Sequence, residues 1–250
     1  MVIEMVQDIY DQIKQNFSKL IDNRNFWKEK VVIKTRILEP QEAIGNPERT
    51  DFPLLKGKER IMQADFKGSN GQAFTDMYGN FEGTLDQIMD MNLNNNYRRA
   101  IFVSTINAVM RHLTLIEGTI HCKDDDPEFC GEELVKHISA NYGTPKIAFV
   151  GFQPALIEHC SKVFEVNVLD LDRKNIGKMK FGLTILDGEK EIDRILKWCD
   201  LAVVTGSTFV NGTAQKIIDQ MKGKSILFYG VTVAGIAELL NLDRFCCRAR

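Results

Sequence analysis

The second half of the chain, residues 144–250, alternates short apolar runs with helical stretches, and this alternation limits the fold more than any other feature. The predicted strands are Lys146–Val150, Val166–Leu169, Phe181–Leu186, Leu201–Val204 and Ser225–Tyr229. The predicted helices between and after them are Ala155–Val163, Glu189–Cys199, Ala214–Met221 and Ala234–Leu240. Runs that are apolar throughout suit strands covered on both faces, and such alternation implies right-handed crossovers. We therefore predict a Rossmann-like parallel sheet.

Residues 1–143 place strands before helices instead. We expect a helix over about the first 20 residues, strands at Val31–Leu38, Ile61–Phe66 and Gln72–Met77, and helices at Thr84–Met91, Tyr97–Leu113 and Gly131–Asn141. A turn is expected at Gly68–Gly71, and Gly143–Pro145 is the expected linker. The order predicts a smaller α+β domain over residues 1–143, followed by the Rossmann-like domain over residues 144–250.

Composition narrows the class of protein. Apolar residues make up 44 % and charged residues 26 %, as in soluble globular proteins, and the net charge of −2 gives no pull toward nucleic acid or an anionic membrane. The longest apolar run, Ser225–Leu240, is broken by glycines, so no membrane span is expected. Glu4, Asp8 and Asp11 interrupt any signal-peptide pattern, which predicts a cytoplasmic protein. The assembly expected from the prevalence of symmetric dimers is a homodimer.

Small and polar residues follow four of the predicted strands. In an open parallel sheet, ligands bind beyond the carboxyl ends of the strands, near the point where strand order reverses. These loops therefore predict one shared ligand site. The candidate ligand-binding residues, with one helix residue added, are Asn107, Gly151, Phe152, Gln153, Pro154, Asp170, Thr205, Gly206, Ser207, Thr208, Asn211, Thr213, Gly230 and Thr232.

Each loop also has a purely structural explanation. Asp170 stands at the spacing after Gly151 at which an acidic residue commonly holds ribose hydroxyls, but it could equally cap a helix. Gly151 lacks the other glycines of a dinucleotide motif, which disfavours NAD. The stretch Thr205–Thr213 (TGSTFVNGT) holds more hydroxyls than one helix cap needs, and its helix N-terminus suits an anionic group. It has no P-loop lysine, which disfavours ATP hydrolysis.

Asn107 borders the apolar face of the predicted helix Tyr97–Leu113. A buried asparagine must be hydrogen-bonded, so Asn107 either serves the structure or faces a cleft between the domains.

Six cysteines are present, and Cys160 and Cys199 fit apolar helical patterns. The segment from His121 to Cys130 mixes soft and hard metal ligands, although its cysteine spacing matches no compact zinc motif. Candidate metal ligands are His121, Cys122, Cys130, Cys246 and Cys247, if the two segments meet in space. The alternative is a solvated acidic loop leading into the next helix. No Ser-His-Asp or Cys-His arrangement can be argued, so no catalytic residue is assigned and enzyme activity stays open.

Three segments resemble the DUF364 family, which is associated with heavy-metal chelation: Ser104–Ala108, Val150–Pro154 and, most specifically, Cys199–Thr213. Gly230–Gly235 departs from the Gly-Pro-Ser-Thr type of sequence that many members have in the corresponding loop. The resemblance implies an enolase N-terminal-like (DUF4213) domain before a Rossmann-like domain, and a cleft between them. It also implies a role near metal, corrinoid or tetrapyrrole metabolism, and it supplies no catalytic residues.

Two functional hypotheses follow. The first is a protein that binds a small molecule, a metal or a metal chelate in the interdomain cleft. The second is a methyltransferase-like enzyme with a nucleoside cofactor such as S-adenosylmethionine, in which Asp170 would hold the ribose. The implied cofactor is a metal ion or a nucleoside, and neither hypothesis involves nucleic acid or a membrane.

Overall fold

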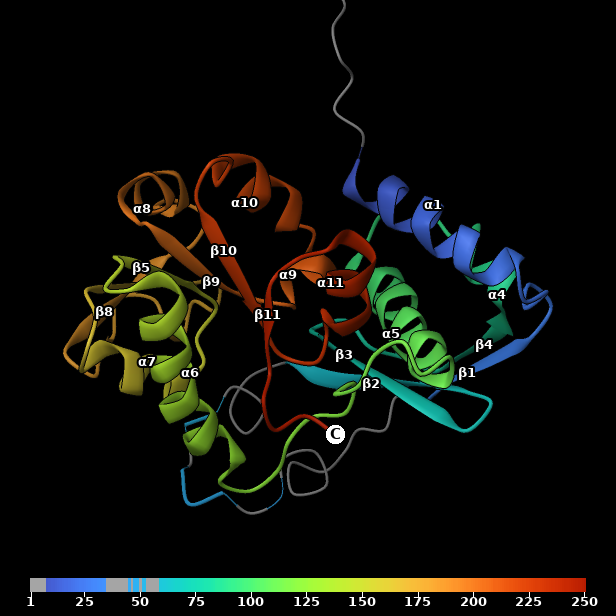
Figure 1. Cartoon of the computed structure of the whole chain (residues 1–250), viewed down its shortest axis with the longest axis horizontal. Helices are drawn as coiled ribbons and strands as arrows, with labels where there is room; N and C mark the ends of the chain where they lie inside the picture. Colours follow the sequence, from blue (N-terminus) through green and yellow to red (C-terminus); the bar gives the residue numbers. More distant parts are fainter. Residues whose placement is uncertain (1–7, 35–44, 46, 50, 53–58) are drawn as a thin grey trace, which may run out of the picture.

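The computed structural model describes residues 8–34, 45, 47–49, 51–52 and 59–250 of the chain (Figure 1). These residues form two sheets. One has four strands in the order β3-β2-β1-β4, and the other has seven in the order β11-β10-β9-β5-β6-β8-β7. The first is antiparallel, and the second is parallel except for β7. The predicted fold class, a Rossmann-like sheet preceded by a smaller α+β part, is confirmed.

The N-terminal part begins with α1 (Ile9–Asp22), whose N-cap Asp8 accepts a hydrogen bond from the Tyr10 N–H. The strands are β1 (Lys30–Lys34), β2 (Arg60–Phe66), β3 (Ser69–Thr75) and β4 (Phe81–Thr84). The β2–β3 hairpin turns at Lys67 and Gly68, both with positive φ, so the turn is shorter than the predicted Gly68–Gly71. Strand β4 was not predicted. The expected continuation of β1 to Leu38, and the helix expected over residues 1–7, lie outside the described residues.

Two helices follow, α4 (Leu85–Met89) and α5 (Asn96–His112). Every residue from Ala100 to Met110 in α5 is buried, because β2 and β3 cover one side of the helix while α9 and α11 pack on the other. The approach of β3 is close: a Cβ placed on Gly71 would lie 2.2 Å from the Ala108 nitrogen. Helix α5 is therefore the element that joins the two sheets into one body (Figure 1).

The remaining elements build the larger sheet. They are α6 (Asp126–Tyr142), β5 (Ile147–Val150), α7 (Pro154–Ser161), β6 (Val166–Asp170), β7 (Met179–Lys180), β8 (Leu183–Asp187), α8 (Ile192–Trp198), β9 (Leu201–Thr205), α9 (Thr208–Asn211), α10 (Ala214–Gln220), β10 (Ser225–Tyr229), α11 (Ala234–Leu240) and β11 (Arg244–Phe245). Counted from β5 and leaving out the short β7, the strand order is the 3-2-1-4-5-6 of Rossmann folds. The order reverses between β5 and β9.

Alternate residues of each central strand enter different cores. In β5, Ala148 packs into the core shared with α8, α10 and α5, while Ile147 and Phe149 pack into the core beneath α6 and α7. The sheet is thus covered on both faces, with α6 and α7 on one side and α8 and α10 on the other (Figure 1). This accounts for strands that read as apolar throughout.

The first core also crosses the predicted domain boundary at residue 143. It contains Phe17 and Phe102 from the N-terminal part together with Phe209 and Ile236 from the C-terminal part. Helix α6 begins at Asp126, five positions before the predicted Gly131, and packs on α7. The division into residues 1–143 and 144–250 remains a prediction.

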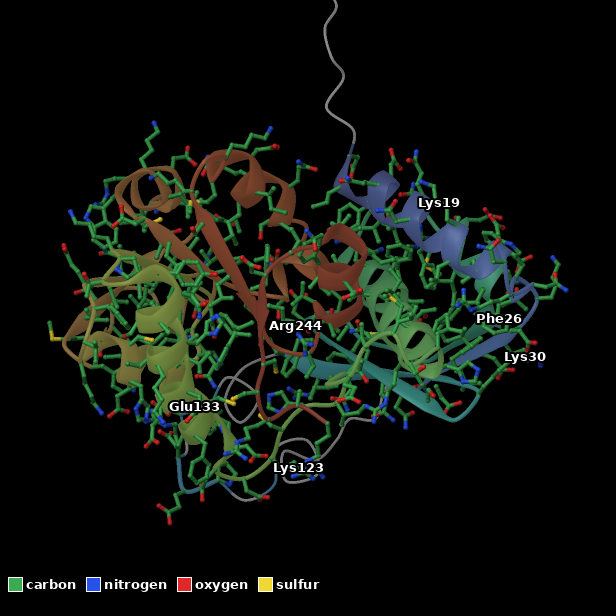
Figure 2. All side chains as sticks on the ribbon, viewed as in Figure 1. Lys19, Phe26, Lys30, Lys123, Glu133 and Arg244 are labelled. Atoms are coloured by element: carbon green, nitrogen blue, oxygen red, sulfur yellow. The ribbon has the colours of Figure 1, made fainter. Side chains whose placement is uncertain are left out.

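Arg244, the first residue of the edge strand β11, links this strand to the N-terminal part through hydrogen bonds. Its Nε donates to the Gly230 carbonyl at 3.0 Å and its Nη2 to the Gly118 carbonyl at 2.6 Å. Figure 2 shows Arg244 near the middle of the molecule, between the two sheets. Within the part of the chain that the structure describes, no helix is long and apolar enough to cross a membrane.

Candidate functional site

A cavity of about 1030 Å³ lies at the carboxyl edge of the seven-stranded sheet. Residues that follow β5, β6, β8, β9 and β10 line it, and so do residues of the N-terminal part, including Phe74 and Thr75 of β3. The reversal of strand order between β5 and β9 falls at this edge. The cavity therefore occupies the place where open parallel sheets bind ligands.

Gly151 and Thr205 meet at the reversal point. Gly151 has a φ of +96°, and a Cβ there would lie 2.7 Å from Thr205 Cγ2 and 3.1 Å from the Tyr229 hydroxyl. The Tyr229 hydroxyl donates to the Gly151 carbonyl at 3.1 Å, and burial raises the pKa of this phenol. Three neighbouring strands are thus packed so tightly at this point that only glycine fits at position 151.

The stretch Thr205–Thr213 contains a short helix, α9, which was not predicted. Its polar side chains bond largely to one another: Thr208 Oγ1 donates to the Thr205 carbonyl at 2.8 Å, and Thr213 Oγ1 donates to Asn211 Oδ1 at 2.7 Å. Ser207 Oγ accepts from Thr205 Oγ1 at 3.3 Å. Thr205, Ser207, Thr208, Asn211 and Thr213 nevertheless all line the cavity. The hydroxyls that exceeded the needs of one cap serve both the loop and the cavity wall.

Asp170 lies at the end of β6 and lines the cavity. Its Oδ1 accepts from the Leu171 N–H at 2.7 Å, and its Oδ2 accepts from Asn175 Nδ2 at 2.7 Å. Burial raises the pKa of this carboxyl, against the lowering effect of those bonds. Asp170 therefore caps no helix, and its carboxylate holds the loop that follows it.

Glu59 lines the same cavity as Asp170 and was missed by sequence reasoning. Burial, together with the negative charges of Asp170, Asp76 and Asp172, raises the pKa of Glu59 to about 7. No motif surrounds Glu59 in the sequence, and only the fold brings it to Asp170. The cavity consequently contains a carboxyl group that changes charge near neutral pH.

The other predicted residues divide into two groups. Phe152, Gln153, Gly230 and Thr232 line the cavity, while Asn107, Pro154 and Gly206 are not among its lining residues. Gln153 also caps α7 by accepting the Leu156 N–H at 2.8 Å. Thr232 is buried, and its Oγ1 accepts from the Phe74 N–H at 3.1 Å. The candidates from the four loops thus largely gather on one cavity.

Asn107 lies in the interior and not on the cavity wall. Its Nδ2 donates to the carbonyls of Gln72, Val231 and Thr232, and its Oδ1 accepts from the Gly235 N–H at 2.7 Å. With its donors and acceptor engaged by backbone, Asn107 fits the structural alternative considered from the sequence.

The charge around the cavity is mainly negative. Its carboxylate side chains are Glu59, Asp76, Asp124, Asp170, Asp172 and Glu189, and its Lys and Arg side chains are Arg173, Lys174 and Lys216. His121 is also on the wall; burial lowers its pKa to about 4, so it is neutral at physiological pH. This excess of negative charge disfavours an anionic ligand, which the helix N-terminus after Thr213 had suggested.

The five candidate metal ligands come near one another. The Ile120 N–H donates to the Arg250 carbonyl at 2.8 Å, and the Arg250 N–H donates to the Ile120 carbonyl at 2.9 Å, which sets the C-terminal segment beside His121 and Cys122. Cys130 Sγ and Cys247 Sγ are 3.2 Å apart. All six cysteines are free thiols, and burial raises the pKa of Cys122 to about 12. Among the described residues, no three His, Cys, Asp or Glu side chains are arranged to hold a metal ion.

Comparisons with known proteins agree with this fold. Residues 134–242 match the model of the DUF364 family, which is described as "Putative heavy-metal chelation". A DUF364 protein of unknown function from Pyrococcus horikoshii is similar over 90 % of this chain and 79 % of its own, with a TM-score of 0.56 at 17 % identity.

A second DUF364 protein of unknown function, from Desulfitobacterium hafniense, has a TM-score of 0.48 at 15 % identity over 72 % of each chain. No curated protein matches the chain. The match over residues 134–242 confirms the resemblance to the DUF364 family seen in the sequence.

Proposed function

We propose that this protein binds a small molecule, with metal chelates included in that class, in the cavity at the carboxyl edge of the seven-stranded sheet. One observation carries the proposal: loops that follow five separate strands, together with β3, line a single cavity of about 1030 Å³. That volume is at the upper end of the range for drug-sized ligands, of roughly 300–1,000 Å³. The family description of heavy-metal chelation is compatible with a chelate as the ligand.

The charge of the wall narrows the ligand further. Because carboxylates outnumber Lys and Arg side chains around the cavity, a neutral or cationic molecule with hydrogen-bond donors is favoured. Glu59 and Asp170 are among the carboxyl groups that could accept hydrogen bonds from such donors. A polyphosphate would meet like charges, and Gly151 is not followed by the further glycines that a pyrophosphate needs.

An enzyme that uses a nucleoside cofactor is the second candidate. It is supported by the position of Asp170 at the end of β6, on the cavity wall, where a ribose would be recognised. The hydrogen bonds from Leu171 and Asn175 weaken it, because a ribose would have to share those carboxylate oxygens.

The proposal is tested by screening cationic and neutral metabolites, metal chelates and adenosyl compounds by thermal shift, with calorimetry on the hits. Ser207→Ala should weaken binding of a hit at least threefold, because Ser207 lines the cavity. Ser161→Ala is the matched control: its hydroxyl bonds the Glu158 carbonyl on α7, away from the cavity, and affinity should not change.

Two results would count against these ideas. If no compound in the panel binds, or if ligands bind equally well to the double variant Thr208→Ala/Asn211→Ala, the cavity is not the site. If adenosyl compounds bind and Asp170→Ala abolishes that binding in a folded protein, the second candidate replaces the first.

A further inference from the structure

Two cysteines that are far apart in the sequence have their sulfur atoms in contact. Cys130 lies near the start of α6, and Cys247 follows β11 near the C-terminus. Their Sγ atoms are 3.2 Å apart, although 117 positions separate the two residues along the chain. A disulfide bond holds its sulfur atoms about 2 Å apart, so a further approach of about 1 Å joins this pair.

The segment around Cys247 is held against α6 by contacts other than the two sulfurs. The Arg248 guanidinium lies over the Phe129 ring, with Cζ 5.3 Å from the ring centroid. Arg250 Nη2 is 3.7 Å from a carboxylate oxygen of Asp126, in the first turn of α6. Cys247 itself lies outside any helix or strand, so its backbone can supply the remaining approach. The pair is therefore brought together by the fold and is free to close.

The two thiols differ in how easily an oxidant reaches them. Cys247 is exposed, whereas Cys130 is buried. Burial, and then the contact with Cys247, raises the pKa of the Cys130 thiol, so Cys130 is protonated at neutral pH. Cys160 and Cys199 are buried in the hydrophobic cores, where thiols are unreactive. An oxidant in solution therefore meets Cys247 first.

We propose that Cys130 and Cys247 form a reversible disulfide by exchange with a low-molecular-weight disulfide of the glutathione type. The Cys247 thiolate attacks one sulfur of the oxidant, whose S–S bond breaks and releases one thiolate. Part of the cause of the raised Cys130 pKa disappears when Cys247 becomes this mixed disulfide. Cys130 then gives its proton to solvent and attacks the Cys247 sulfur, which releases the second thiolate. Two protein thiols are thus oxidised to one S–S bond, and the oxidant is reduced to two thiols.

The disulfide joins two parts of the cavity wall. Pro127 and Cys130 of α6 line the cavity, and so do Phe245 of β11 and the next residue, Cys246. Oxidation therefore fixes α6 and the segment after β11 relative to one another at the cavity. The disulfide forms whether or not the cavity binds the small molecule proposed above.

The probe is glutathione disulfide, added to full-length protein that has been reduced and then freed of reductant. Remaining thiols are blocked with iodoacetamide, and tryptic peptides are measured by mass spectrometry. We expect peptide Asp124–Lys136 joined to peptide Phe245–Arg248, and an intact mass lower by two hydrogen atoms before blocking. Because the second peptide also contains Cys246, Cys246→Ser is needed, and it should cross-link at the parent rate.

Three further variants define the pair. Cys247→Ser should cross-link at least tenfold more slowly, because the exposed sulfur that starts the exchange is gone. Cys130→Ser should keep glutathione on Cys247, because no second thiol releases it. Cys160→Ala removes a core thiol outside the pair and should leave cross-linking unchanged. Oxidation should also raise the melting temperature of the parent protein, but not that of Cys247→Ser, and dithiothreitol should reverse the rise.

Folding is checked in each variant by its circular dichroism spectrum, and the exposed Cys247→Ser keeps the test usable if Cys130→Ser unfolds. The proposal is overturned if the parent protein gathers glutathione adducts without the cross-link. It is equally overturned if Cys247→Ser cross-links Cys130 as fast as the parent, or if the cross-links join two chains. Ser207→Ala should cross-link at the parent rate, so failure here is distinct from failure of the small-molecule proposal.

Discussion

Asn107 and Gly235 are hydrogen-bonded across the two halves of the protein, with Asn107 Oδ1 accepting the Gly235 N–H at 2.7 Å. The same side chain donates through Nδ2 to the carbonyls of Val231 and Thr232. These residues belong to the loop that follows β10, and Val231 and Thr232 line the cavity. One side chain of α5 therefore fixes a wall of the cavity that the other half of the chain provides.

Replacing Asn107 with alanine should lower the free energy of unfolding by about 3 kcal/mol, because several buried backbone groups lose their partner at once. Chemical denaturation measures the change. Asn141→Ala is the control, since Asn141 is exposed and bonds only within α6, to His137. Equal losses in the two variants would contradict the role given to Asn107.

Gly151→Ala should destabilise the protein by about 3 kcal/mol, through backbone strain and the clash with Thr205 Cγ2. Gly143→Ala supplies the comparison. Gly143 also has a positive φ, but a Cβ there meets nothing within 4 Å, so only the strain of about 1 kcal/mol is expected. The difference between the two melting temperatures isolates the crowding at the reversal point, and its absence would show that the strands can separate there.

Glu59→Gln should change how stability depends on pH. In the unfolded chain the Glu59 carboxyl ionises near its ordinary pKa of 4.5, whereas in the folded protein the pKa is raised to about 7. The folded state binds more protons between these values, so Glu59 lowers stability as pH rises from 4.5 to 7.

The glutamine variant removes that dependence. We expect it to match the parent protein at pH 4 and to be more stable by about 3 kcal/mol at pH 8. Urea denaturation across this pH range is the measurement. A parent protein no less stable than the variant at pH 8 would mean that Glu59 is not held among the acidic groups as described.

Arg49→Gln should cost about 2 kcal/mol, because Arg49 is largely buried and pairs with Asp51, Glu128 and Glu158 at once. Thermal unfolding at low and high salt checks this. The exposed pair of Lys30 and Glu82 is the control, and Lys30→Gln should change stability by less than about 0.5 kcal/mol. A similarly small effect at Arg49 would show that the network adds nothing beyond an ordinary surface pair.

The larger sheet was predictable because its central strands are buried on both faces and therefore read as continuous apolar runs. Strand β11 was not predictable, because its two residues, Arg244 and Phe245, are too few to show a periodic pattern. They form a strand only because they pair with β10. Likewise α9 is a single turn inside a polar stretch whose side chains mainly bond to one another. Short helices and strands are stabilised by tertiary contacts with residues distant in the sequence, so the local sequence does not reveal them.

The candidate site was predictable to the extent that it lies at strand ends. The loops at Gly151, Asp170, Thr205 and Gly230 follow from topology, and the fold gathers them as expected. Glu59 could not be found, because it comes from the other half of the chain and no motif marks it. Asn107 borders an apolar face in the sequence, and only the positions of Val231 and Gly235 show which groups it satisfies.

The hydrophobic core shared by the two sheets has a consequence for how a ligand enters. Phe102 of α5 and Phe209 of α9 belong to the same buried cluster, so the walls of the cavity cannot swing apart without exposing that cluster to water. A ligand should then meet walls that are already in place and lose little affinity to ordering the protein. Heating should likewise unfold both sheets in a single transition.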